Sequence, residues 1–228
     1  MQPLYAPVGE KKVRELVPEA TYTARIYRLL TLGEQETMFT DEVTGEPISQ
    51  FKIDVTFELP YETRDFGKGE QPMVISKEYT LSFNEKATLR KLINSIEGKA
   101  LTDAEAVNYD ILSIIGKAVQ IQVVHKTSKA GNERAEVSNT LGLSKGMVCP
   151  PQVNGSQILT FQNWSEELFL GLPQFMREKI EKSQEYQTMR GTYKPKFELP
   201  KVAVKGVSPT DTTIDYGDTN VNVDDIPF

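Results

Sequence analysis

Three stretches in the first third of the chain alternate between apolar and polar residues, the pattern of half-buried β-strands. They are TYTARIYRLLTL (21–32), QFKIDVTFEL (50–59) and MVISKEYTLSF (73–83). In the second, every apolar side chain falls on one face: Phe51, Ile53, Val55, Phe57 and Leu59. In the first, the alternation places Tyr22, Ala24 and Ile26 opposite Thr23, Arg25 and Tyr27. The third is expected to turn Ile75, Tyr79 and Leu81 inward.

The connections between these stretches are polar and rich in turn-forming residues. GEQETMFTDEVTGEPIS (33–49) and PYETRDFGKGEQP (60–72) carry several Gly, Pro and charged residues. Such compositions indicate loops. We therefore expect two long loops flanking the second strand.

The period changes at NEKATLRKLINSIEG (84–98), which predicts an amphipathic helix. Its apolar residues have the i, i+3, i+4, i+7 spacing: Leu89, Leu92, Ile93 and Ile96. Asn84 is the expected N-cap and Gly98 the expected end. A short helix or turn is predicted in YDILSIIGK, ending at Gly116. Two further strands, AVQIQVVHKTS (118–128) and NERAEVSNTLGLS (132–144), flank a hairpin loop, KAGN.

The predicted order is three strands, one helix and two strands. This order matches the OB-fold, a five-stranded, partly open Greek-key barrel. The fold class expected is therefore mainly β, with the generic alternative of an α+β domain built on one antiparallel sheet. The barrel is expected to span residues 18–148, after a flexible lead-in at 1–17.

Residues 149–192 are predicted to form a linker and a helical extension packed on the barrel. Ser165 is an N-cap candidate, and a second helix is expected to begin near Pro173. The apolar residues expected to pack are Trp164, Phe169, Leu172 and Phe175. From residue 193 the apolar periodicity ends, which predicts a disordered linker and an acidic protein-interaction tail at 193–228.

The charge of the chain is unevenly distributed. Of the 228 residues, 26 are basic and 32 acidic, and the net charge is −6. Residues 206–228 hold five aspartates and no Lys or Arg, so the remainder is close to neutral. An acidic total therefore does not exclude a nucleic-acid partner, which responds to local basic patches.

The sequence offers little for catalysis. Cys149 and His125 are single, so a disulfide, a His-based metal site and a Ser-His-Asp triad are not expected. The motifs GxxxxGK[ST], HExxH, CxxC and GxSxG are missing. We predict no catalytic residue, no metal, no cofactor and no membrane segment, and interpret His125 as a polar strand residue facing solvent or DNA.

Binding to a single strand requires cations for the phosphates and exposed aromatic rings for the bases. The strands and loops of the predicted barrel supply both kinds of residue. The candidates are Arg25, Tyr27, Arg28, Lys52, Tyr61, Arg64, Phe66, Lys68, Lys77, Tyr79, Lys126, Lys129 and Arg134. The ordinary alternative is that the cations are solvated strand residues and that Tyr27 and Tyr79 belong to the core.

The chain ends in DDIPF, residues Asp224, Asp225, Ile226, Pro227 and Phe228. Phe228 combines an apolar ring with the terminal carboxylate, a pair that an apolar pocket beside an Arg or Lys captures. The two aspartates would steer this tip toward the basic rim of the partner's pocket, and Pro227 limits the entropy lost on docking. The tail is also expected to compete for a basic binding surface, so its deletion should tighten DNA binding at low salt.

The tip after an acidic linker resembles the bacterial single-stranded DNA-binding protein family, SSB. Stretches such as KEYTLSFNEKATLRKLINSI, IIGKAVQIQVVHK and NWSEELFLGLPQFMREKIEKSQEY are similar to phage-encoded OB-fold proteins of this kind. The body departs from cellular SSB in its long first loop and helical segment, so the family's tetramer and base-stacking positions are not carried over.

The resemblance implies a non-enzymatic protein that coats single-stranded DNA during phage replication and recombination. Host replication and repair proteins would bind its tip, in the cytoplasm of an infected bacterium. Two alternatives remain open: an adaptor that mimics the tail of the host SSB to recruit or sequester host repair enzymes, and a recombination mediator that anneals strands.

Overall fold

A computed structural model describes residues 15–67, 69–128 and 131–192. Five strands form an antiparallel sheet in the order β3-β2-β1-β4-β5. The strands are β1 (Ala20–Thr40), β2 (Pro47–Asp65), β3 (Glu70–Thr80), β4 (Ala118–Thr127) and β5 (Glu133–Leu141). A short sixth strand, β6 (Gln157–Leu159), runs parallel to β1.

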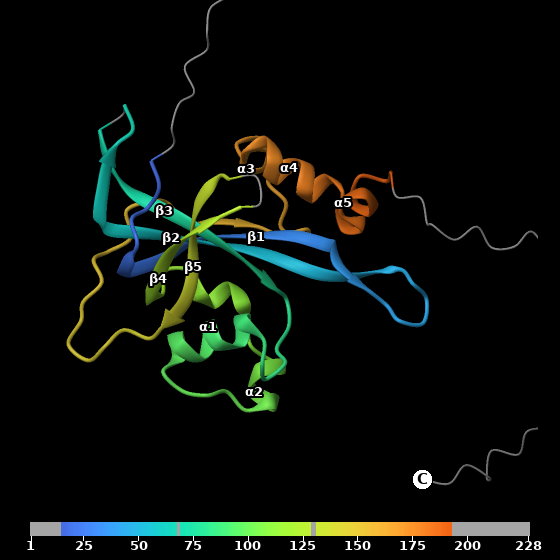
Figure 1. Ribbon diagram of the computed structural model, residues 1–228, viewed down its shortest axis with the longest axis horizontal. Helices are drawn as coiled ribbons and strands as arrows, with labels where there is room; N and C mark the ends of the chain where they lie inside the picture. Colours follow the sequence, from blue (N-terminus) through green and yellow to red (C-terminus); the bar gives the residue numbers. More distant parts are fainter. Residues whose placement is uncertain (1–14, 68, 129–130, 193–228) are drawn as a thin grey trace, which may run out of the picture. The chain divides into compact units, whose positions relative to one another are not determined.

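The sheet curls into a half-barrel with α1 (Thr88–Glu97) placed between β3 and β4 in the chain (Figure 1). The two ends of the sheet, β3 and β5, approach each other without forming a ladder. This is an OB-fold-like arrangement, so the predicted fold class is confirmed. α2 (Asp103–Val107) and a 3-10 helix, Ile111–Ile114, complete the connection from α1 to β4.

Apolar side chains from the sheet and α1 fill the half-barrel. Ile53, Val55, Phe57 and Leu59 are at most 1% exposed, as the alternation in the second stretch predicts. Leu89, Leu92 and Ile93 meet them from α1. The helix ends at Gly98, whose φ of +66° suits glycine, but its N-cap is Ala87 and not the predicted Asn84.

The two predicted loops are β-ribbons. β1 and β2 stay paired as far as Thr40 and Pro47, where the Asp41 carboxylate accepts hydrogen bonds from the Val43 and Thr44 amides. β2 and β3 likewise pair as far as Asp65 and Glu70. A two-stranded ribbon outside the barrel has solvent on both faces, so its sequence is polar and does not show the alternation of a half-buried strand.

β1 contributes to two cores because a β-bulge interrupts its alternation. The register shifts between Ile26 and Arg28, so Tyr27 and Arg28 both lie on the outer side of the sheet, where Tyr27 is only 7% exposed. Beyond the bulge, Leu29 faces the half-barrel, whereas Leu30 and Leu32 face a second apolar cluster on the outer side of the sheet.

The second cluster fastens the C-terminal helices to the outer side of the sheet (Figure 1). These are α3 (Glu166–Leu170), α4 (Gln174–Glu181) and α5 (Gln184–Met189). Ser165 caps α3 and Pro173 precedes α4, as predicted. Phe169 and Leu172 are buried, but Phe175 is 64% exposed, and Met176 and Ile180 occupy the packing face instead.

Candidate nucleic-acid interface

Arg25 is a structural residue and not a free cation. Its guanidinium donates hydrogen bonds of 2.6–2.9 Å to the carbonyls of Gly116, Cys149 and Pro150. Glu58, which is fully buried, accepts from the Val153 and Asn154 amides on the same segment. Together these two side chains hold residues 149–154 against β1 and β2, so the DNA contact predicted for Arg25 is not supported by its geometry.

Tyr27 and Arg28 lie side by side on the outer face of the sheet. The Arg28 guanidinium lies 5.9 Å from the Tyr27 ring centroid and donates a 3.0 Å hydrogen bond to the Thr56 hydroxyl. Burial raises the Tyr27 pKa, and Arg28 opposes that shift. A ring this buried offers no face to a base, so Tyr27 is excluded as a stacking platform.

Asp54 gives this outer face an acidic character. It is 1% exposed, and burial raises its pKa to about 6 against the opposing effects of Arg28 and the Thr56 hydroxyl. Glu78 pairs with Asp54 across the β2–β3 ladder and forms an ion pair with Lys179 of α4. The strand 2–3 face, where OB-folds often bind oligonucleotides, therefore combines carboxylates with the C-terminal helices in this chain.

Tyr79 also belongs to the core, at 2% exposure. Its cross-strand partner is Ile53, and burial raises the pKa of its hydroxyl well above the ordinary value. The sequence alternation placed Tyr79 inward, and the structure agrees. Its second predicted role, stacking on bases, is therefore wrong for the fold as it stands.

A group of cations gathers where β3 approaches the β4–β5 hairpin. We call Lys77, Lys126, Arg134 and Glu136 the seam cluster. Glu136 accepts from Lys126 at 2.9 Å and lies 3.5 Å from Arg134. Burial lowers the Lys77 pKa, while Glu136 raises it and Lys126 lowers it. Lys126 and Arg134 thus pair with the Glu136 carboxylate and Lys77 interacts with it electrostatically, which leaves an excess of positive charge in the cluster.

The predicted ring-and-cation series Tyr61, Arg64 and Phe66 lies on the β2–β3 ribbon. Tyr61 and Phe66 are 66% and 61% exposed. The Tyr61 hydroxyl donates a 3.3 Å hydrogen bond to the Val148 carbonyl, which holds this exposed ring in place. Arg64 pairs with Glu15 at 3.1 Å, so its charge is partly offset.

Of the remaining residues singled out in the sequence, some are half-buried and the others lie outside the part of the chain that the structure describes. Lys52 is half-buried on β2, opposite Thr80 of β3. His125 is also half-buried: its Nε2 lies 2.8 Å from the Val17 carbonyl, so it ties Val17 to β4. Lys68, Lys129 and the tip, Asp224–Phe228, lie outside the described residues.

Sequence reasoning missed two features. Phe39, on the β1–β2 ribbon, is 70% exposed, and its segment was interpreted as a loop. Glu58 stands in a regular alternation as a solvent-facing acid, yet it is buried. The burial of Glu58 carries no local signal, because its hydrogen-bond donors, Val153 and Asn154, lie far away in the chain.

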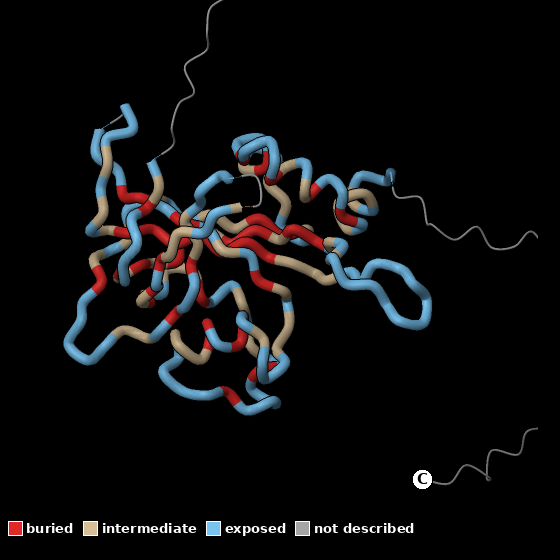
Figure 2. The backbone as a smooth tube through the Cα atoms, viewed as in Figure 1, coloured by how far each residue is buried: buried red, intermediate tan, exposed pale blue. Residues whose placement is uncertain are grey.

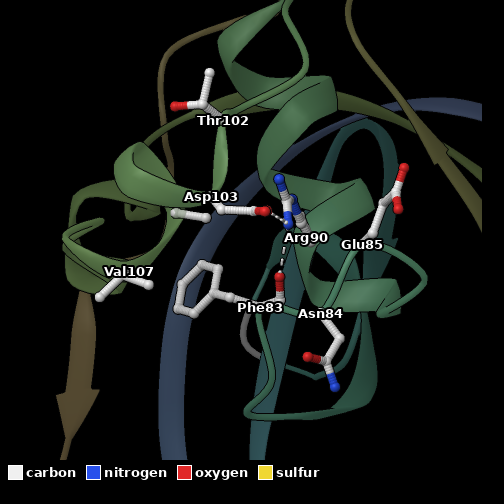
Figure 3. A pocket seen from close by; sticks show the side chains of 8 residues that line it. Phe83, Asn84, Glu85, Arg90, Thr102, Asp103 and Val107 are labelled. Atoms are coloured by element: carbon white, nitrogen blue, oxygen red, sulfur yellow. Dashed lines mark hydrogen bonds and ion pairs between the residues drawn. The ribbon is translucent and has the colours of Figure 1, made fainter.

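A pocket of about 600 Å³ lies between the end of β3, the start of α1 and α2 (Figure 3). Arg90, 6% exposed, lines it and donates to the Phe83 and Leu101 carbonyls and to the Asp103 carboxylate. These bonds join three segments of the chain. The arginine is therefore committed to the fold and is not a free phosphate ligand.

Within residues 15–67, 69–128 and 131–192, the structure contains no group of three or more His, Cys, Asp or Glu side chains suited to a metal ion. None of the helices in this part of the chain has the length and apolarity to cross a membrane. No known protein-family model matches the chain, and no curated protein sequence matches it.

Proposed function

We propose that this protein binds single-stranded DNA without enzymatic activity and with little sequence preference. The OB-fold-like half-barrel is an architecture that serves oligonucleotide binding in many proteins, although a fold alone does not establish a function. The proposal therefore depends on the side chains that the fold leaves accessible.

The seam cluster is the observation that carries the proposal. Lys126 and Arg134 face each other across the β4–β5 ladder, with side chains 54% and 69% exposed. Lys77 has lost part of its hydration, which its lowered pKa reflects, so a phosphate beside it would favour its charged form. Three cations around one carboxylate attract a polyanion, and the loop between β4 and β5 borders the binding face in OB-folds.

Tyr61 and Phe66 supply the second requirement. Both rings are exposed in the described part of the β2–β3 ribbon, and Tyr61 is fixed by its hydrogen bond to Val148. A ring already held in position loses less freedom when a base stacks on it. Stacking of this kind tolerates any base, which suits a protein that coats strands of varied sequence.

The C-terminal tip supports a second part of the proposal. DDIPF combines an apolar ring with two aspartates, a combination suited to capture by a partner's apolar pocket with a basic rim. We assign it to recruitment of host replication and repair proteins during phage replication or recombination.

The seam cluster is tested by reversing its charge. In the full chain, K126E/R134E should lose most single-strand affinity, measured by fluorescence anisotropy with a homopolymer oligonucleotide. K86E/K91E, with one residue just before α1 and one within it, changes the net charge equally, and both of its residues are exposed, so it serves as the matched control. Circular dichroism checks that each variant is folded.

Equal affinity of the two variants would contradict the assignment of the seam cluster. A wild-type protein that binds no single strand would instead favour the adaptor that mimics the host tail. Acceleration of complementary-strand pairing in an annealing assay would favour the mediator.

A further inference from the structure

The β1–β2 ribbon is strongly acidic and has an apolar end. From Gly33 to Phe51 the chain carries no Lys or Arg and five acidic residues: Glu34, Glu36, Asp41, Glu42 and Glu46. Met38 is 98% exposed and Val43 93%, close to the exposed Phe39 ring. Figure 2 shows the ribbon as an exposed arm projecting from the body. A polynucleotide is repelled by such a surface, whereas a cationic protein surface is attracted.

Long cationic side chains match both properties of this ribbon. They neutralise carboxylates, their methylene stems cover apolar groups, and their charged ends bind aromatic faces. The seam cluster of this same chain presents such side chains, with Lys126 and Arg134 largely exposed around Glu136. The chain therefore carries two complementary surfaces.

The two surfaces do not meet within one molecule. The base of the ribbon is fixed, because the Glu34 amide donates to the Glu185 carboxylate at 3.0 Å and the Gln35 side chain donates to the Lys179 carbonyl at 3.1 Å. From this base the ribbon points away from the body, well apart from the β4–β5 hairpin (Figure 1). Symmetric pairing of two ribbons would place like charges together, which is unfavourable.

We propose that the β1–β2 ribbon of one copy docks on the seam cluster of a second copy. The contact is head-to-tail, so each copy leaves one ribbon and one seam cluster open, and association continues into rings or open chains. One consequence rests on the proposed function: single-stranded DNA and the neighbour's ribbon compete for the same cations, so DNA should separate copies joined in this way.

Sedimentation velocity of the full chain without nucleic acid tests the contact. At about 20 mM salt the mean sedimentation coefficient should rise with protein concentration, and at about 500 mM it should return to the monomer value because salt screens exposed charges. A monomer at every concentration in dilute salt would overturn the proposal.

Charge-swapped variants test which surfaces meet. E42K/E46K makes the ribbon less acidic, and K126E/R134E makes the seam cluster acidic, so each variant alone should lose the association. In a mixture of the two variants, the unaltered ribbon of K126E/R134E can meet the unaltered seam cluster of E42K/E46K, so association into pairs should return. Association of E42K/E46K at the wild-type level would assign the contact to another segment, and a mixture of folded variants that stays monomeric would equally reject the pairing.

Two further measurements sharpen the result. Phe39→Ala should weaken association about two- to fivefold, the size expected for loss of an exposed cation–π contact; an unchanged association would remove the ring from the contact. E42K/E46K retains the seam cluster, so it should bind single strands at least as well as wild type. Self-association without DNA binding would reject the proposed function and leave this inference standing.

Discussion

Asp54 shows how one residue on a regular strand makes stability depend on pH. Its folded-state pKa is about 6, above the ordinary value of 3.8, because burial disfavours the charge. The protonated form is therefore the one that the fold favours. Its contribution to stability is complete below about pH 4 and is lost as the pH rises through 6.

Asp54→Asn should therefore raise the free energy of unfolding at pH 8 by up to about 3 kcal/mol and leave it nearly unchanged at pH 4. Urea unfolding at the two pH values measures this difference. Glu42→Gln, at an exposed position on the ribbon, is the control and should show none. If Asp54→Asn destabilises equally at both pH values, the charge at this site is not what limits stability.

Two exposed aromatic rings in different surroundings allow base stacking to be distinguished from mere exposure of a ring. Tyr61 is 66% exposed beside Val148, and Phe39 is 70% exposed on the acidic ribbon. Tyr61→Ala should weaken single-strand binding by about 1–3 kcal/mol, the value of one stacked base, whereas Phe39→Ala should not weaken it. The comparison uses anisotropy titrations in a buffer of moderate salt. Equal effects would remove Tyr61 from the interface.

Several residue roles were beyond the reach of sequence reasoning. Tyr27 is buried on the outer face beside a β-bulge, and no local pattern predicts either the bulge or the burial. Arg25 bonds to carbonyls about 125 residues away, so its commitment to the fold depends on tertiary structure alone. Tyr79 was correctly predicted to face inward, and the same alternation should have removed it from the stacking candidates.

At the scale of elements, the close packing of β1 on α5 depends on Gly33. Its φ is +74°, and a Cβ built there would lie 2.5 Å from the Ser183 Cβ. Gly45 has a similar φ of +70° but nothing within 4 Å of the same position. Substitutions at Gly33 and Gly45 can therefore be compared to distinguish the cost of backbone strain from the cost of steric overlap.

Gly45→Ala should cost about 1–2 kcal/mol, the strain of a left-handed backbone. Gly33→Ala should cost more, by roughly 1–3 kcal/mol of overpacking, because Ser183 is itself buried. Chemical denaturation of both variants provides the measurement. Similar losses for the two glycines would show that α5 yields easily and is not held firmly on β1.

The order of strands and helices followed from periodicity, because the half-barrel and α1 each bury one face. The paired strands of the two ribbons could not be predicted from periodicity, since a segment with solvent on both faces has no apolar alternation. β6 was missed for a related reason: three residues are too few to show a period, and its pairing with β1 fixes it.

At the scale of the whole molecule, DNA binding and partner recruitment are assigned to separate parts of the chain. Deleting Phe228 should leave single-strand affinity unchanged and abolish binding to host enzymes that recognise such a tip, because the Phe228 ring is the group that the partner's apolar pocket would hold. Surface plasmon resonance with one purified host repair enzyme of this class provides the measurement. Docking that survives the deletion would show that the contact lies elsewhere.

The central claim is that the folded body holds unpaired strands through charge and rings. Its most direct test is a titration of the full-length protein with a dT homopolymer and with the matching duplex across a series of salt concentrations. The account predicts clear preference for the single strand and an affinity that falls with salt, with a log–log slope of about −0.7 for each phosphate contact. Absence of single-strand binding in dilute buffer, or equal affinity for the duplex, would contradict it.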